Sequence, residues 1–142
     1  MLNIVKLTDT LGVSAQITPE DVAEIAARGY RVLINNRPEG EEEAQPAEST
    51  IAAAAREAGI EYHFMPVTHS TFPGPHFDAM SDLLDDQERP VLAFCRSGTR
   101  CANLWVASVD AIHRKSAADI AKQRGFDLGM VSRLLAQGGT EC

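Results

Sequence analysis

The stretch VLAFCRSGTR, residues 91–100, places a cysteine between an apolar run and a helical pattern. The run Val91–Phe94 is typical of a strand buried inside a sheet. After Arg100 the chain has helical periodicity, and we expect four apolar side chains on its inward face: Ala102, Trp105, Val109 and Ile112. The sequence therefore predicts that Cys95 lies where a strand turns sharply into a helix.

Cys95 at such a turn is predicted to be a reactive thiol. Backbone N–H groups converge at the start of a helix, and the positive end of the helix dipole points at the sulfur. Flanking arginines further favour the thiolate, which is the nucleophile, and small residues let the loop wrap around an anion. The alternative is an unreactive buried cysteine followed by an ordinary basic turn. We expect catalytic roles for Cys95 and Arg100, and substrate binding by Arg96, Ser97, Gly98 and Thr99.

The composition indicates one globular domain, residues 1–142, large enough for its own hydrophobic core. Apolar residues make up 44% and charged residues 23% of the chain, as in ordinary soluble domains. The formal net charge of −7 argues against nucleic acid as a partner. Neither a membrane span nor a signal-peptide core is recognisable, so no membrane partner is expected. Cys95, Cys101 and Cys142 form no disulfide framework, which favours a reducing, cytoplasmic compartment.

Strand patterns alternate with helical patterns along the chain. We expect strands at residues 11–17, 31–36, 61–67 and 90–94, with residues 4–7 as a candidate partner of the first. Expected helices run from Thr18 to Gly29, over residues 48–58 and 76–85, after Arg100, and over residues 116–124 and 128–135. This order implies an α/β fold of three layers, a mostly parallel sheet flanked by helices. Ligands of such sheets bind beyond the carboxyl ends of the strands, where Cys95 is expected.

Three segments resemble one bacterial family: VSAQITPEDV (residues 13–22), VLINNRPEGEE (32–42) and VLAFCRSGTR. Over about residues 7–135 the chain is similar to the phosphatase-like domain of beta-lactamase hydrolase-like proteins. This resemblance implies the architecture of cysteine phosphatases of the dual-specificity type. Members of the family are often called sulfurtransferases, and CRSGTR itself resembles the rhodanese-type loop, whose cysteine carries a persulfide. Fusion of some relatives to a metallo-beta-lactamase-like dioxygenase implies a persulfide dioxygenase as a functional partner.

Loop length favours sulfur transfer over phosphate hydrolysis. Cysteine phosphatases have one residue more between cysteine and arginine than the four found here, whereas rhodanese-type loops match. A smaller ring suits a single outer sulfur better than a tetrahedral phosphate. A phosphatase also needs a general acid, and the candidate loop THSTFPGPH, residues 68–76, holds no carboxylate. His69 or His76 could substitute, and Asp78 lies just beyond the loop. The alternatives are a phosphatase with a phosphocysteine intermediate, and a non-catalytic module that senses sulfur or anions.

The expected cycle has two steps. The Cys95 thiolate takes sulfur from thiosulfate, a glutathione persulfide or a polysulfide, and a thiol, sulfite or cyanide then removes it. No metal or organic cofactor is required, and the four histidines lack metal-ligand spacing.

Three further features have open interpretations. Cys101 replaces the usual serine of the family and is either a packing residue or a resolving thiol for Cys95. Arg37 is expected to be a substrate contact or a structural residue at a strand end. The acidic run of Glu39 and Glu41–Glu43 is expected to be a solvated loop, with restriction of substrate charge as the alternative. Cys142 is expected to be an inert tail thiol.

Overall fold

The computed structural model describes residues 2–138, so Cys142 lies outside the described residues. Five strands form one sheet in the order β1-β2-β5-β3-β4. They are β1 (Val5–Thr8), β2 (Leu11–Ser14), β3 (Val32–Asn35), β4 (Glu61–Phe64) and β5 (Val91–Phe94). Only β1 is antiparallel to its neighbour; the pairs β2·β5, β5·β3 and β3·β4 are parallel.

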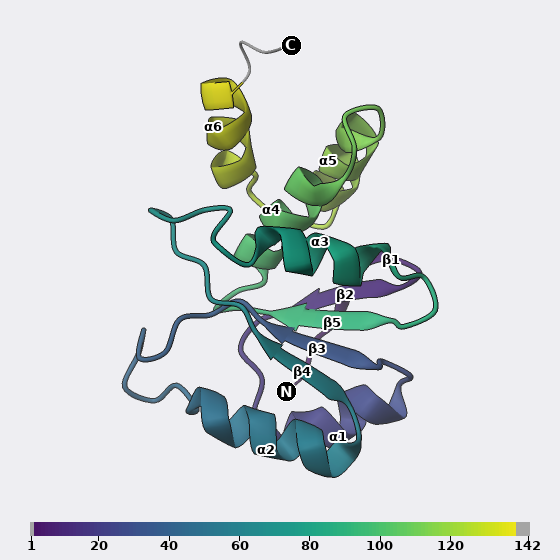
Figure 1. Ribbon diagram of the computed structural model, residues 1–142, viewed down its shortest axis with the longest axis vertical. Coiled ribbons are helices and arrows are strands. Elements are labelled where there is room, and N and C mark those ends of the chain that lie inside the picture. Colours follow the sequence, from purple (N-terminus) through teal and green to yellow (C-terminus); the bar gives the residue numbers. More distant parts are fainter. Residues whose placement is uncertain (1, 139–142) are drawn as a thin grey trace.

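Helices cover both faces of the sheet, as Figure 1 shows. On one face lie α1 (Pro19–Ala27) and α2 (Glu48–Ala58). On the other lie α3 (Phe77–Asp85) and α4 (Thr99–Ser108), and α5 (Arg114–Gln123) and α6 (Gly129–Gly138) pack against α4 farther from the sheet. The predicted three-layer α/β fold with a mostly parallel sheet is therefore confirmed.

Successive side chains of the central strands point to opposite faces of the sheet and so contribute to two separate hydrophobic cores. Leu92 and Phe94 of β5 point into the cluster beneath the sheet, against Ile25 of α1 and Ile51 of α2. Ala93 and the following Cys95 belong to the opposite cluster, which the other helices cover. Both faces of β5 are therefore buried, which explains its uninterrupted apolar sequence.

Local signals set the ends of several helices. The Thr18 side chain accepts a hydrogen bond from the backbone N–H of Asp21, whose carboxylate accepts one from the backbone N–H of Thr18, and Pro19 occupies the first turn. At the end of α2, Gly59 adopts the left-handed conformation with φ of 75°.

The expected inward position of Ile112 is wrong. The helix α4 ends at Ser108, because Val109 has an extended backbone with ψ of 143°, and Ile112 is 87% exposed. Trp105, Ala102 and the other inward residues of α4 do lie in the core. Among the described helices, none combines the length and apolarity that a membrane span requires.

Candidate active site

The cysteine loop, residues Cys95–Arg100, follows the middle strand of the sheet. The backbone N–H of Cys95 donates to the carbonyl of Ser14, and that of Gln16 donates to the carbonyl of Arg96, both across 3.3 Å. Gly98 turns the loop back through a left-handed conformation, with φ of 91°, into the first turn of α4. Its N–H then points at the cysteine and lies 3.1 Å from Sγ. The loop thus encloses the sulfur, and Cys95 is only 1% exposed.

The surroundings of Cys95 favour its thiolate. The pKa of Cys95 is lowered to about 6, and the largest cause is a hydrogen bond from the Cys101 thiol. Burial acts in the opposite direction, whereas the backbone N–H groups of Cys101 and Ser97 lower the pKa further. The charge of Arg100 contributes in the same direction. The expectation of a lowered pKa is confirmed, but its leading cause is the neighbouring thiol, which the loop and dipole argument did not include. Burial and the adjacent Cys95 raise the pKa of Cys101, so it stays a protonated donor.

Arg100 is half-buried and is held by groups of the protein. Its Nη1 donates to the carbonyl of Val67 across 3.0 Å, and its Nη2 donates to Oε1 of Glu41 across 2.9 Å. Arg96, in contrast, has a side chain that is 64% exposed, and its Nη2 lies 3.6 Å from Glu42. Of the two loop arginines, Arg96 is thus the one that presents its guanidinium to solvent.

The acidic segment, residues Glu39–Glu43, is exposed as expected, but it also forms ion pairs beside the cysteine loop. Two of its carboxylates, those of Glu41 and Glu42, pair with arginines: Arg37 and Arg100 for the first, Arg37 and Arg96 for the second. Burial would raise the pKa of Glu41, but hydrogen bonds from Arg100 and Arg37 lower it overall. Glu41 is therefore a fixed anion beside the cysteine loop at neutral pH.

Arg37 holds the acidic segment in place through hydrogen bonds to Glu41 and Glu42. Its side chain is 2% exposed, and its three nitrogens donate to Glu41 (2.9 Å), Glu42 (2.7 Å) and Gln16 (3.0 Å). Burial would lower the pKa of Arg37, but the bonds to Glu42 and Glu41 raise it overall. Of its two expected roles, this placement favours the structural one.

An open pocket of about 470 Å³ lies at the mouth of the cysteine loop. Its lining combines loop residues with three other segments: Glu41, His69, Arg96, Ser97, Thr99, Arg100, Asp127 and Met130. The hydroxyl of Ser97 donates to that of Thr99 across 3.0 Å within this lining. The structure thus brings His69 to the loop, whereas His76 occupies the N-cap position of α3.

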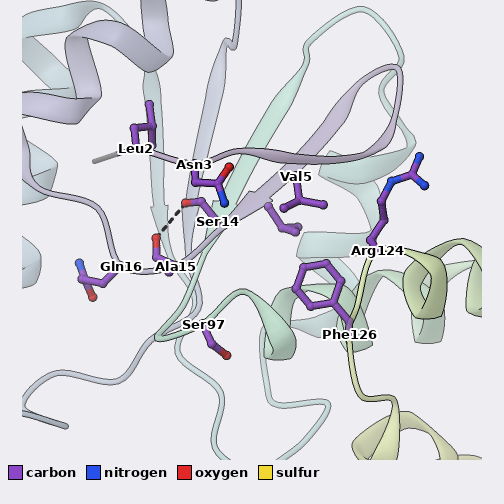
Figure 2. A pocket seen from close by; sticks show the side chains of 10 residues that line it. Leu2, Asn3, Val5, Ser14, Ala15, Gln16, Ser97, Arg124 and Phe126 are labelled. Atoms are coloured by element: carbon purple, nitrogen blue, oxygen red, sulfur yellow. Dashed lines mark hydrogen bonds between the residues drawn. The ribbon is translucent and has the colours of Figure 1, made fainter.

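Figure 2 shows a smaller pocket of about 170 Å³ on the other flank of the loop. It lies between the N-terminal segment, the residues after β2 and the connection from α5 to α6. Ser97 lines both pockets, and the ring of Phe126 borders this one. The loop therefore has a hollow on each side.

Sequence reasoning missed two residues that shape the site, Asp127 and Asn103. Asp127 lies outside the loop in which a carboxylate was sought. Asn103 of α4 is fully buried and bridges the carbonyls of Thr99 and Asp127 and the N–H of Val131. An asparagine between Ala102 and Leu104, on the stretch expected to pack inward, was the signal that could have identified it.

This sheet, with a cysteine loop between its middle strand and a helix, defines the class of cysteine-phosphatase-like proteins. Its fold is shared with Tk-PTP (TM-score 0.72, 14% identity, 94% of each chain covered) and with the kinase associated phosphatase (TM-score 0.68, 16% identity, covering 92% of this chain and 85% of that one). Residues 3–112 match the phosphatase-like domain of beta-lactamase hydrolase-like proteins, and the chain belongs to this family.

Closer relatives agree with this assignment. Beta-lactamase hydrolase-like proteins are 34% identical over 137 residues in Agrobacterium fabrum and 36% identical over 131 residues in Xylella fastidiosa. These matches cover 94% and 90% of this chain but only 32% and 30% of the relatives, so the chain spans about a third of their length. A candidate phosphatase from Neisseria meningitidis has 34% identity and a TM-score of 0.74, covering 92% of this chain and 95% of that one. The expected family and dual-specificity-phosphatase-like fold are thus confirmed.

Proposed function

We propose that this domain is a sulfurtransferase that carries sulfane sulfur as a persulfide on Cys95. One observation carries the proposal: the loop is a residue shorter than a phosphatase loop, and both terminal nitrogens of Arg100 already have protein partners. A phosphatase needs this guanidinium to grip two phosphate oxygens. An outer sulfur atom makes no such demand, since one N–H such as that of Gly98 can stabilise it.

Each step of the proposed cycle breaks one sulfur–sulfur bond and forms one new bond to the transferred sulfur, a sulfur–sulfur bond in every case except transfer to cyanide, where a carbon–sulfur bond forms. The Cys95 thiolate attacks the outer sulfur of a small persulfide or of thiosulfate, and the donor leaves as a thiolate or as sulfite. The thiolate of an acceptor, or sulfite or cyanide, then attacks the outer sulfur on Cys95 and restores the Cys95 thiolate. The leaving groups are stable anions, so the cycle needs no strong general acid. A persulfide dioxygenase that consumes the product persulfide remains the proposed functional partner.

A specific observation favours a second candidate, a cysteine-dependent phosphatase. The solved structures with this fold include phosphatases, and the comparisons favour this chemistry over sulfur transfer. The lining of the pocket also includes Asp127, whose carboxyl group is of the kind that serves as a general acid. Against this role, Asp127 Oδ1 already accepts the N–H of Gly129 at 2.8 Å, which ties it to the start of α6. The other pocket carboxylate, Glu41, is held ionised by two arginines and is unsuited to donate a proton.

Mass spectrometry after exposure to glutathione persulfide or thiosulfate tests the proposal. The peptide with Cys95 should gain one sulfur atom, lose it again to a thiol, and show no gain in Cys95→Ser. Hydrolysis of an aryl phosphate, measured on the same preparation, should be weaker in catalytic efficiency. Phosphatase turnover that requires Cys95, without any sulfur loading, would establish the second candidate instead.

Loop size can be varied directly. One small residue inserted between Thr99 and Arg100 should abolish sulfur transfer and introduce vanadate binding. Unchanged sulfur transfer in the enlarged loop would show that ring size does not select the chemistry.

A further inference from the structure

One oxygen atom of Glu41 joins two arginines at the mouth of the cysteine loop. Oε1 accepts hydrogen bonds from Nη2 of Arg100 and from Nε of Arg37, each across 2.9 Å. The Glu41 side chain is 28% exposed, so it lies at the boundary between the interior and the pocket that it helps to line. A carboxylate of this chain thus binds one of the terminal nitrogens through which Arg100 would contact an incoming oxyanion.

Two neighbouring residues, Arg37 and Gln45, fix the position of Glu41. Arg37 beneath it is buried, and breaking its pair with Glu41 would leave a guanidinium nitrogen without its anion, which is costly in the interior. Gln45 closes the acidic segment, because its amide oxygen accepts the N–H of Glu41 (3.0 Å) and its amide nitrogen donates to the carbonyl of Pro38 (2.9 Å). An external anion therefore competes with a preorganised internal one.

We infer that Glu41 is a specificity-determining residue that excludes doubly charged oxyanions from the cysteine loop and selects organic persulfides as donors. Like charges within a few ångströms repel strongly at a half-buried site. Phosphate and thiosulfate bring two negative charges to the loop, whereas the outer sulfur of a persulfide carries at most one, and the carboxylates of a peptide persulfide lie several bonds away. The inference deepens the proposed function and rests on it for the identity of the donor; the exclusion of oxyanions concerns binding alone.

The exclusion is measured without turnover. Inorganic phosphate, added at increasing concentration, is tested for its ability to protect Cys95 from iodoacetamide in the wild type and in Glu41→Gln. Glutamine keeps an oxygen acceptor for Arg37 and removes only the charge. The apparent phosphate affinity of Glu41→Gln should rise about tenfold. The matched control is Glu43→Gln, which removes the same charge from an exposed position of the same segment and should behave as the wild type.

A shorter side chain gives an independent variant. Glu41→Asp keeps the charge, but one methylene less prevents it from reaching both guanidiniums, so phosphate affinity should rise severalfold. This variant carries the test if Glu41→Gln does not fold. Equal phosphate affinity in the wild type and the folded Glu41 variants would overturn the inference. An equal rise of phosphate affinity in Glu43→Gln would overturn the inference as well, since the cause would then be the net charge of the protein and not the position of Glu41.

A second measurement compares how well the wild type and the variants use two sulfur donors. The ratio of kcat/KM for thiosulfate to that for glutathione persulfide should rise about tenfold in Glu41→Gln and stay constant in Glu43→Gln. A constant ratio in Glu41→Gln would overturn the selection of donors. If no variant loads sulfur but Glu41→Gln gains phosphate affinity, the proposed function fails while oxyanion exclusion by Glu41 stands.

Discussion

The backbone N–H of Gly98 points at Sγ of Cys95 across 3.1 Å, so the residue that turns the loop also stabilises its nucleophile. Two kinds of donor converge on this sulfur, the N–H groups of the backbone and the thiol of Cys101.

The reactivity of Cys95 should follow a pKa of about 6. Protonation below that pH removes the thiolate, so the alkylation rate at pH 5 should be about tenfold below its plateau, which is reached near neutrality. Iodoacetamide labelling followed by peptide mapping measures this profile, and Cys95→Ser supplies the background of the other thiols. A rate that climbs steadily to pH 9 would contradict an activated thiolate.

Replacement of Cys101 should move this profile in a graded way. Cys101→Ala removes the hydrogen bond that leads in lowering the pKa of Cys95, so the midpoint should shift to higher pH. Cys101→Ser keeps a donor, and its midpoint should stay nearer to that of the wild type. Identical midpoints for the alanine and serine variants would reduce Cys101 to a packing residue.

Mild peroxide should distinguish a resolving thiol from a simple donor. Oxidation of Cys95 to a sulfenic acid, followed by condensation with the Cys101 thiol and loss of water, would give a disulfide that thiols reverse. Cys101→Ser should keep sulfur transfer but lose activity irreversibly under peroxide. The resolving role fails if sulfinic Cys95 accumulates equally fast in both proteins.

Alanine at Gly98 should destabilise the loop more than alanine at Gly125. Both glycines have positive φ, 91° and 94°, so both variants incur the left-handed strain of about 1–3 kcal/mol. A Cβ at Gly98 would also lie 3.3 Å from the Phe126 ring and 3.4 Å from the Ser14 carbonyl, whereas nothing lies within 4 Å at Gly125. Urea unfolding measures the loss of unfolding free energy in each variant, and the difference between the two losses is the cost of crowding at Gly98. Equal losses would show that crowding at Gly98 costs nothing.

Asn103→Ala should cost about 2–4 kcal/mol of unfolding free energy, because it leaves buried backbone groups of two segments without partners. Ser108→Ala, at the other end of α4, removes one local hydrogen bond and should cost less than about 1 kcal/mol. Chemical denaturation compares the two. Similar small losses would mean that water replaces the asparagine.

The parts of the fold that could be predicted are those with local causes. The capping residues Thr18 and Asp21 satisfy the first N–H groups of α1 wherever that helix packs, and the apolar runs of β3 and β5 can only be buried. Ile112 was misassigned because helical periodicity continues in the sequence beyond Val109, where the backbone becomes extended. Periodicity alone does not reveal where a helix ends.

The site likewise has features with local causes, which could be predicted, and features that depend on the fold, which could not. The cysteine loop is continuous in the sequence, so its turn, its small residues and its helix start could be recognised together. Glu41 and Asp127 reach the loop only through the order of the strands and the path of the chain after α5. An acidic run is usually solvated, as this one is, and its pattern does not reveal that the buried Arg37 binds Glu41 and Glu42.

The central place of β5 has a consequence for hydrogen exchange. Neighbouring chain segments bond to both of its edges at the loop: the Cys95 N–H to Ser14 on one side, and the Asn36 N–H to the Phe94 carbonyl (2.9 Å) on the other. The chain cannot fray there without separating the middle of the sheet, so the Cys95 amide should exchange only by global opening. Partial unfolding events that release the outer helices would therefore leave the backbone around Cys95 in its native hydrogen bonds.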